Sequence, residues 1–250
     1  MKIAVIIQAR MGSKRLPGKT LMMIGGKPAI AHVVDRVRRS KLMTHYCVAT
    51  TTNVEDDTLV AWAAEYGAPC FRGNELNVLD RYYEAARSVC ADVVVRVTGD
   101  CPLVDPTVID SVINRYLKGD KIFDYVSNIH PPTFPDGLDV EVFSFKSLEC
   151  AWREAQLLSE QEHVTPYIWK HPELFNQTSI SSEVDLSNNR WTLDSSEDLV
   201  FFQQLALHCA FLENATTEEI LEIIQNNPVL PTLNCQHIRN EGYEKSLLID

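Results

Sequence analysis

The chain has 250 residues, of which 45% are hydrophobic and 23% are charged, and its formal net charge is −11. These values argue against a disordered chain and fit one globular domain, or one domain with a small appendage. An acidic chain is also unlike a general binder of nucleic acid or of membrane surfaces. Residues 3–7 are too short an apolar run for a signal peptide or a membrane span, and the seven cysteines form no CxxC pair. We therefore expect a cytoplasmic protein.

Apolar runs and helical patterns alternate through the first half of the chain. The runs that predict strands lie at 2–8, 45–51, 69–72 and 92–97, and the patterns that predict helices lie at 28–40, 54–66, 77–89 and 105–118. Such repeated units predict an α/β protein with a doubly wound, Rossmann-like sheet that has helices on both faces. Ligands of these sheets bind beyond the carboxyl ends of the strands.

The second half of the chain is more mixed. Strand patterns lie at 122–127, 138–143 and 188–193, and helix patterns lie at 144–157, 160–170, 195–208 and 216–226. Turn-forming residues recur from 228 onward, so we expect that segment to pack loosely.

The strongest chemical signal is the segment 8–20 (QARMGSKRLPGKT), which follows the first predicted strand. It combines small residues with four cations. The small residues are Gly12, Ser13 and Gly18, and the cations are Arg10, Lys14, Arg15 and Lys19. Small residues let backbone amides approach phosphate oxygens, and the cations can neutralise them. The segment therefore predicts a site for a triphosphate.

This segment has two other interpretations. The P-loop pattern GxxxxGK[ST] requires four residues between its glycines, whereas Gly12 and Gly18 enclose five, and Pro17 lies where that loop must curl around the β-phosphate. A basic turn without a ligand is the second alternative. The fingerprint GxGxxG of dinucleotide-binding proteins is absent from the sequence.

One aspartate lies where a metal ion would meet a triphosphate, and a second ends a later motif. Asp100 follows the predicted strand 92–97, and a carboxylate at the end of a central strand is well placed to hold Mg²⁺. Asp194 ends the run RWTLD, just before a predicted helix. Each has a structural alternative as a helix-capping or turn residue.

Together with the segment 8–20, several further motifs resemble the SpsF-like branch of the sugar nucleotidyltransferases, which is related to the CMP-sugar-acid synthetases. These motifs are ATTTNVEDD at 49–57, FRGNELNVLDRY at 71–82, RVTGDCPLVD at 96–105, YVSN at 125–128, PDGLDVEVF at 135–143, EHVTPY at 162–167 and RWTLD at 190–194. They cover most of residues 1–200 in order. The resemblance implies the nucleotide-diphospho-sugar transferase fold, with a mixed, mainly parallel sheet.

The resemblance also implies a reaction and its participants. The expected protein is a Mg²⁺-dependent nucleotidyltransferase that joins a nucleoside monophosphate, with CTP as the favoured donor, to a sugar or sugar acid. It implies catalytic roles for Arg10, Lys19 and Asp100, with Asp100 and Asp194 as metal ligands. A homodimer is common among relatives, so a homodimer is possible here.

The remaining expected site residues form two groups. The nucleotide-binding group is Ala9, Gly12, Ser13, Arg15, Gly18, Arg72, Asn77 and Arg81. The acceptor-binding group is Asp136, Asp139, Glu141, Glu162 and His163. Asn77 could equally be a plain helix cap, and His163 could equally be a structural histidine.

The expected organisation is a single domain over 1–250. Residues 1–127 form its nucleotide-binding half, 128–190 form an acceptor-binding elaboration, and 191–250 form the C-terminal helices and tail. A glycosyltransferase of the same fold and a nucleotide-binding regulator are the alternatives. The first usually needs an Asp-x-Asp metal motif, and the spacing of Asp136 and Asp139 does not provide one.

Overall fold

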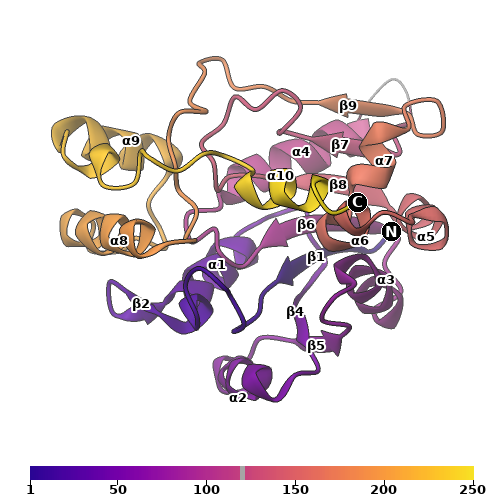
Figure 1. Cartoon of the computed structure of the whole chain (residues 1–250). Helices are drawn as coiled ribbons and strands as arrows, with labels where there is room; N and C mark the ends of the chain where they lie inside the picture. Colours follow the sequence, from indigo (N-terminus) through magenta and orange to yellow (C-terminus); the bar gives the residue numbers. More distant parts are fainter. Residues whose placement is uncertain (119–121) are drawn as a thin grey trace.

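The computed structural model describes residues 1–118 and 122–250, and a seven-stranded sheet forms its centre (Figure 1). Its strand order is β5-β4-β1-β6-β8-β7-β9. The strands are β1 (Ile3–Gln8), β4 (His45–Thr51), β5 (Cys70–Gly73), β6 (Val93–Thr98), β7 (Tyr125–Ser127), β8 (Glu141–Ser144) and β9 (Gln177–Ser179). Only β8 runs antiparallel to its neighbours, β6 and β7. The predicted mixed, mainly parallel sheet is therefore confirmed.

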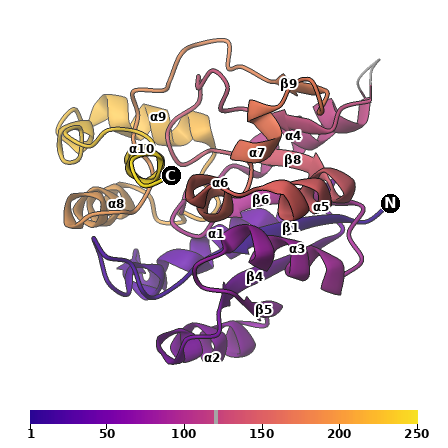
Figure 2. The ribbon, with the colours of Figure 1, turned by 45° about the vertical axis from the view of Figure 1, so that its right-hand side comes forward.

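Helices cover both faces of the sheet, because the side chains of β1 alternate between two apolar layers. Val5 and Ile7 pack in one layer with α1 (Ala29–Arg38), α2 (Asp57–Tyr66) and α4 (Pro106–Lys118). Ala4 and Ile6 pack in the other with α3 (Val78–Ser88), α5 (Phe145–Glu154) and α7 (Pro166–Lys170). In Figure 2, α3, α5 and the short α6 (Leu158–His163) lie over this second face.

A third apolar cluster lies beyond the carboxyl ends of the strands. It joins α8 (Ser196–His208) and α9 (Thr217–Asn226) to Trp191, Leu193 and the hairpin of β2 (Met23–Ile24) and β3 (Lys27–Pro28). Short 3-10 turns lie at Lys19–Leu21, Val54–Asp56 and Leu230–Thr232. Both views show α10 (Glu241–Leu247) between the α8–α9 pair and α6 (Figures 1 and 2). None of the described helices is long and apolar enough to cross a bilayer.

Two expectations from the sequence are wrong. The segment 188–193 is not a strand: it pairs only once, at Arg190 with Asp136, because Trp191 and Leu193 turn into the third apolar cluster. The helix expected at 160–170 is two helices, since Val164 has φ 75° and Pro166 starts the second. No helix was expected in the segment from 228, which contains α10.

Candidate active site

A pocket of about 440 Å³ opens at the carboxyl ends of β1 and β6. Its walls come from parts of the chain that are far apart in sequence: the loop 8–20, the loop after β6, the start of α3, the end of α6, Asp194 and α10. Because parallel strands end at the same edge of a sheet, loops from several strands meet there. The predicted triphosphate segment therefore lines this pocket together with the ends of β1 and β6.

The loop 8–20 is held by its own backbone and by the segment after β4. Gly18 donates to the carbonyl of Met11 at 3.0 Å, and the amide of Met11 donates to Asp56 at 2.6 Å. Gly18 has φ 75°, a conformation that favours glycine. A Cβ at residue 12 would lie 2.2 Å from Oε1 of Glu55, so a larger residue there would require the flexible side chain of Glu55 to move aside. The loop then enters a 3-10 turn, which is unlike the long helix that follows a P-loop.

Lys19 bridges the two predicted metal carboxylates. Its Nζ lies 2.7 Å from Oδ2 of Asp100 and 2.7 Å from Oδ1 of Asp194. The side chain of Lys19 is only 12% exposed. Side chains from the first loop, the end of β6 and the start of α8 therefore meet at one point, although 175 residues separate Lys19 from Asp194.

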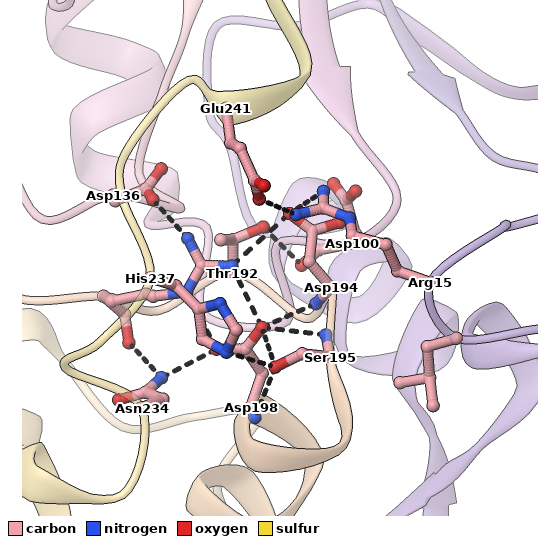
Figure 3. A network of polar contacts seen from close by, with 12 residues as sticks. Arg15, Asp100, Asp136, Thr192, Asp194, Ser195, Asp198, Asn234, His237 and Glu241 are labelled. Carbon is pink, nitrogen blue, oxygen red and sulfur yellow. Dashed lines mark hydrogen bonds and ion pairs between the residues drawn. The ribbon is translucent and has the colours of Figure 1, made fainter. Parts of the chain in front are cut away.

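The row of charges continues toward α10. Arg15 lies 2.9 Å from Oδ2 of Asp194 and 2.8 Å from Oε2 of Glu241. Figure 3 shows Arg15 between these two carboxylates, with Asp100 beside them. Cations and anions alternate along this row, so the loop 8–20 connects the carboxylates to α10.

Burial alone would favour the neutral forms of Lys19 and Asp100. The two carboxylates beside Lys19 outweigh that effect and raise its pKa above the usual value. For Asp100, the ammonium of Lys19 and local hydrogen bonds likewise outweigh burial and hold its pKa at about 2. Both groups are charged at neutral pH, and each keeps the other ionised.

The structural alternative for Asp194, a helix cap, is not what the structure shows. The cap of α8 is Ser195, whose hydroxyl accepts from the amide of Asp198 at 3.2 Å. Asp198 accepts in return from the amides of Asp194 and Ser195, each at 2.9 Å. Because Ser195 and Asp198 cap α8, the carboxylate of Asp194 does not cap it. This carboxylate faces Arg15 (Figure 3) and Lys19.

Asp100 is positioned in a similar way. The start of α4 is held by Asp105, which accepts from the amide of Thr107 at 2.7 Å, so Asp100 does not cap that helix. The carbonyl of Asp100 accepts from the amide of Leu193 at 2.7 Å. This hydrogen bond ties the loop after β6 to the segment before α8 and so places the two aspartates together.

The other expected nucleotide-binding residues divide into two groups. Ala9, Arg10, Ser13 and Arg81 line the pocket together with Arg15. Gly12, Gly18, Arg72 and Asn77 do not line it.

Arg72 and Asn77 make structural contacts instead. Arg72 donates to the carbonyls of Thr51 and Asn53 and pairs with Asp57 at 2.7 Å. Asn77 caps α3 by accepting from the amide of Asp80 at 2.8 Å. A nucleotide role for either residue stays a prediction.

The expected acceptor-binding residues also divide. Glu162 and His163 line the pocket at the end of α6. Asp136 is paired with Arg190 at 3.2 Å, and Asp139 is paired with Arg239. Neither aspartate lines the pocket.

Glu141 is a buried structural carboxylate. It is paired with Arg96 and accepts from Tyr125 at 2.7 Å and from Thr165 at 2.6 Å. It lies in the middle of the sheet and does not line the pocket, and an acceptor role for it stays a prediction.

The sequence reasoning missed one wall of the pocket, which α10 supplies through Gly242, Lys245 and Ser246. The region 228–250 was expected to pack loosely, and seven helical residues after a run of turn signals give little local pattern. The contacts that hold α10 join residues far apart in the sequence, so no local motif predicts them.

A divalent cation would fit the two aspartates. Among residues 1–118 and 122–250, no three His, Cys, Asp or Glu side chains gather closely enough to hold a metal ion by themselves. Mg²⁺ prefers oxygen ligands, keeps several waters, and is commonly held by one or two carboxylates plus substrate phosphates. Asp100 and Asp194 lie close enough to share one ammonium, so they are suited to share one cation.

Comparisons with known proteins identify the family that this chain resembles. Residues 4–231 match the family described as cytidylyltransferase. The chain is 33% identical over 233 residues to the spore coat polysaccharide biosynthesis protein SpsF of Bacillus subtilis, and the match covers 90% of this chain and 95% of the relative. It is 43% identical over 122 residues to a 3-deoxy-manno-octulosonate cytidylyltransferase of Anaeromyxobacter sp., a match that covers 47% of this chain and 48% of that one.

A solved structure is similar over nearly the whole chain. It is a cytidylyltransferase from Leptospira borgpetersenii serovar Hardjo-bovis, with a TM-score of 0.88 and 31% sequence identity. The similarity covers 96% of this chain and 98% of the other. The resemblance inferred from the sequence motifs is therefore confirmed.

Proposed function

The chain belongs to the cytidylyltransferase family, and from this premise we propose that it transfers CMP from CTP to a sugar or sugar acid in the synthesis of polysaccharide precursors. The names of two relatives support this proposal, one a spore coat polysaccharide biosynthesis protein and the other a 3-deoxy-manno-octulosonate cytidylyltransferase. The observation that carries it is the position of Lys19, which lies between Asp100 and Asp194 in a pocket lined by further cations.

The triphosphate would lie along the loop 8–20. Arg10, Arg15 and Lys19 line the pocket and would neutralise the β- and γ-phosphates, with Arg10 and Arg15 able to grip oxygens bidentately. The backbone of Ala9 and the side chain of Arg81 would contact the nucleoside, because both lie in the pocket at the α3 side of β1. Binding would require Lys19 to exchange one carboxylate partner for a phosphate oxygen.

Asp100 and Asp194 would hold Mg²⁺. When bound, Mg²⁺ neutralises phosphate charge and polarises the phosphorus under attack. The ionised state that Lys19 imposes on Asp100 prepares that carboxylate to act as a ligand.

The reaction needs no covalent nucleophile on the protein. An acceptor oxygen would form a bond to the α-phosphorus while the bond from that phosphorus to the bridging oxygen breaks and pyrophosphate leaves. Such transfers depend on positioning and on charge stabilisation. Arg10 and Lys19 would stabilise the leaving pyrophosphate, and Glu162 and His163 would orient the acceptor at the other side of the pocket.

The first test is pyrophosphate release. The full chain is incubated with Mg²⁺, one of CTP, UTP, GTP or ATP, and a panel of sugar acids and sugar 1-phosphates. Release that requires CTP and one acceptor is the expected result. Release only with another triphosphate, or CTP binding without release in the whole panel, would contradict the proposal.

A matched pair of variants shows where the chemistry occurs. Asp100→Asn removes a proposed metal ligand and should lower turnover by about a thousandfold or more, in line with the loss of a main stabilising group. Asp92→Asn changes the same residue type next to the other end of β6, outside the pocket. It should keep normal turnover. Equal activity in the two variants would contradict the assigned role of Asp100.

We propose the cytoplasm as the site of the reaction. All seven cysteines, each within the described residues, are free, which suits a reducing compartment. A homodimer stays a prediction from the family resemblance.

A further inference from the structure

The helix α10 forms a wall of the active-site pocket. Gly242, Lys245 and Ser246 line the pocket from this helix, and Ile249 follows them. In both views α10 lies next to α6, whose Glu162 and His163 line the same side of the pocket (Figures 1 and 2). The two helices therefore form one continuous wall, which the ion pair of Arg15 with Glu241 joins to the loop 8–20.

Several polar contacts hold α10 and its flanking residues in this position. The hydroxyl of Ser246 lies 2.8 Å from Glu162 and 3.0 Å from Nε2 of His163. The carboxylate of Asp250 accepts from the amide and hydroxyl of Ser159, at 2.7 and 2.6 Å. Contacts at both ends of the segment fix its register against α6, so the groups that face the pocket have defined positions.

The segment before α10 is fixed as well. Arg239 is paired with Asp139 and donates to the carbonyl of Phe134 at 2.9 Å. Asp139 belongs to the motif at 135–143 and was expected to bind the acceptor. Its carboxylate thus positions α10 indirectly and does not face the pocket.

Lys245 is the one cation that α10 contributes to the pocket. Its ammonium lies 2.5 Å from Glu241, and the side chains are 64% and 36% exposed. Exposed pairs four residues apart on a helix are weak, so Lys245 can exchange Glu241 for another anion at little cost. The cations of the loop 8–20 would already be paired with the triphosphate, whereas Lys245 would remain available for the acceptor.

The match to the family ends at residue 231, before α10. The residues proposed for nucleotide transfer, namely the loop 8–20, Asp100 and Asp194, lie within the match. The part of the wall that α10 supplies lies outside the match, whereas Glu162 and His163 of α6 lie within it.

We propose that α10 determines acceptor specificity, and that Lys245 binds an anionic group of the acceptor while Ser246 and Glu162 bind its hydroxyls. This inference rests on the proposed function. A sugar that carries one carboxylate or one phosphate fits the wall, since an ammonium binds either anion and hydroxyl groups can donate to Glu162. A neutral sugar would offer Lys245 no anion, so Lys245 would stay paired with Glu241.

The test follows backbone amide signals by NMR in the full chain. Three probes are titrated in turn: 3-deoxy-manno-octulosonate as the carboxylate, glucose 1-phosphate as the phosphate, and glucose as the neutral sugar. At least one anionic probe should shift the signals of Gly242 and Ser246, and glucose should not. The shift should weaken about tenfold or more in apparent affinity for Lys245→Met and be largely retained for Lys245→Arg.

Two controls make the outcome decisive. Lys146→Met changes an exposed lysine on α5 outside the pocket and should bind the probes like the unchanged chain. CTP is titrated into the same samples and should shift the signals of the loop 8–20 in every variant. If CTP binds and no anionic probe moves α10, or if Lys245→Met binds normally, the specificity inference is wrong. If CTP itself does not bind, the proposed function is wrong instead.

Discussion

Arg15 and Glu241 are joined by an ion pair of 2.8 Å although 226 residues separate them in the sequence. Arg15 belongs to the loop that is predicted to bind the triphosphate, and Glu241 is the first residue of α10. The pair therefore links the nucleotide side of the pocket to the wall that faces the acceptor. A triphosphate and Glu241 would compete for the same guanidinium.

This competition predicts the effect of Glu241→Gln. With the carboxylate neutralised, Arg15 is freer to bind phosphate, so the affinity for CTP should rise about two- to fivefold, the range that an exposed ion pair provides. The melting temperature should be nearly unchanged. Titration of CTP followed by calorimetry measures the effect. Glu244→Gln, on the same helix but outside the pocket, is the control and should leave the affinity unchanged. An affinity that falls for Glu241→Gln would mean that the pair supports triphosphate binding.

A second prediction concerns the central ammonium. In Lys19→Met, Asp100 and Asp194 face each other without the cation between them, so the free energy of unfolding should fall by about 1–3 kcal/mol when EDTA is present. Mg²⁺ can take the place of the ammonium and should restore more stability to this variant than to the unchanged chain. Chemical denaturation with and without Mg²⁺ measures both effects.

The control for this prediction is Lys14→Met. Lys14 lines the same pocket but has no ion pair among the described residues. It should show neither the loss of stability nor the added response to Mg²⁺. If Mg²⁺ stabilises Lys19→Met and the unchanged chain equally, the two aspartates do not form the metal site.

The sequence predicted that the segment 8–20, Asp100 and Asp194 would lie at one site, although half of the expected nucleotide-binding group does not line the pocket. The alternation of apolar runs with helix patterns identified the four parallel strands, and β–α topology then requires their carboxyl ends to meet. For that reason the motif at 8–20 and Asp100 could be placed in one site before any contact was known. Asp194 could be added because the motif RWTLD resembles a family pattern, even though the segment that contains it is not a strand.

The acceptor side could not be predicted in the same way. The resemblance implied that Asp139 and Glu141 face an acceptor, but Glu141 is buried against Arg96 and Asp139 meets Arg239 from the segment before α10. Both partners come from distant parts of the chain, and a local pattern does not identify them. For the same reason the wall formed by α10 was missed.

A third prediction concerns the support of Asp194. Asp198 is fully buried and accepts hydrogen bonds from Arg190, Asn234 and Ser195 (Figure 3). In Asp198→Asn the charge of Arg190 loses its nearest carboxylate, which is fully buried, and keeps only Asp136 and Asp194, so the free energy of unfolding should fall by about 2–4 kcal/mol. Urea denaturation measures this change. Glu197→Gln, the exposed neighbour on the same helix turn, should leave stability nearly unaltered; comparable losses in the two variants would show that the buried network is not the cause.

The last prediction is a pH dependence that arises from His163. Burial lowers its pKa to about 4, with the charge of Arg96 adding to the effect and the carboxylates of Glu162 and Glu141 opposing it. In the unfolded chain the histidine takes up a proton near pH 6.5, whereas in the folded chain it remains neutral. Because the pKa of His163 is lower in the folded state, its contribution to the free energy of unfolding is fully present above pH 6.5. This contribution is lost as the pH falls toward 4.

This dependence amounts to about 3 kcal/mol at most over that interval. His163→Gln can keep a hydrogen bond to Ser246 but cannot titrate, so its stability should fall less steeply between pH 6.5 and 4. His208→Gln, at an exposed position on α8, should follow the unchanged chain. Urea denaturation at several pH values gives the slopes, and NMR titration of the ring of His163 should give a midpoint well below pH 6. A midpoint near 6.5 would mean that His163 is open to solvent and that α10 does not cover it in solution.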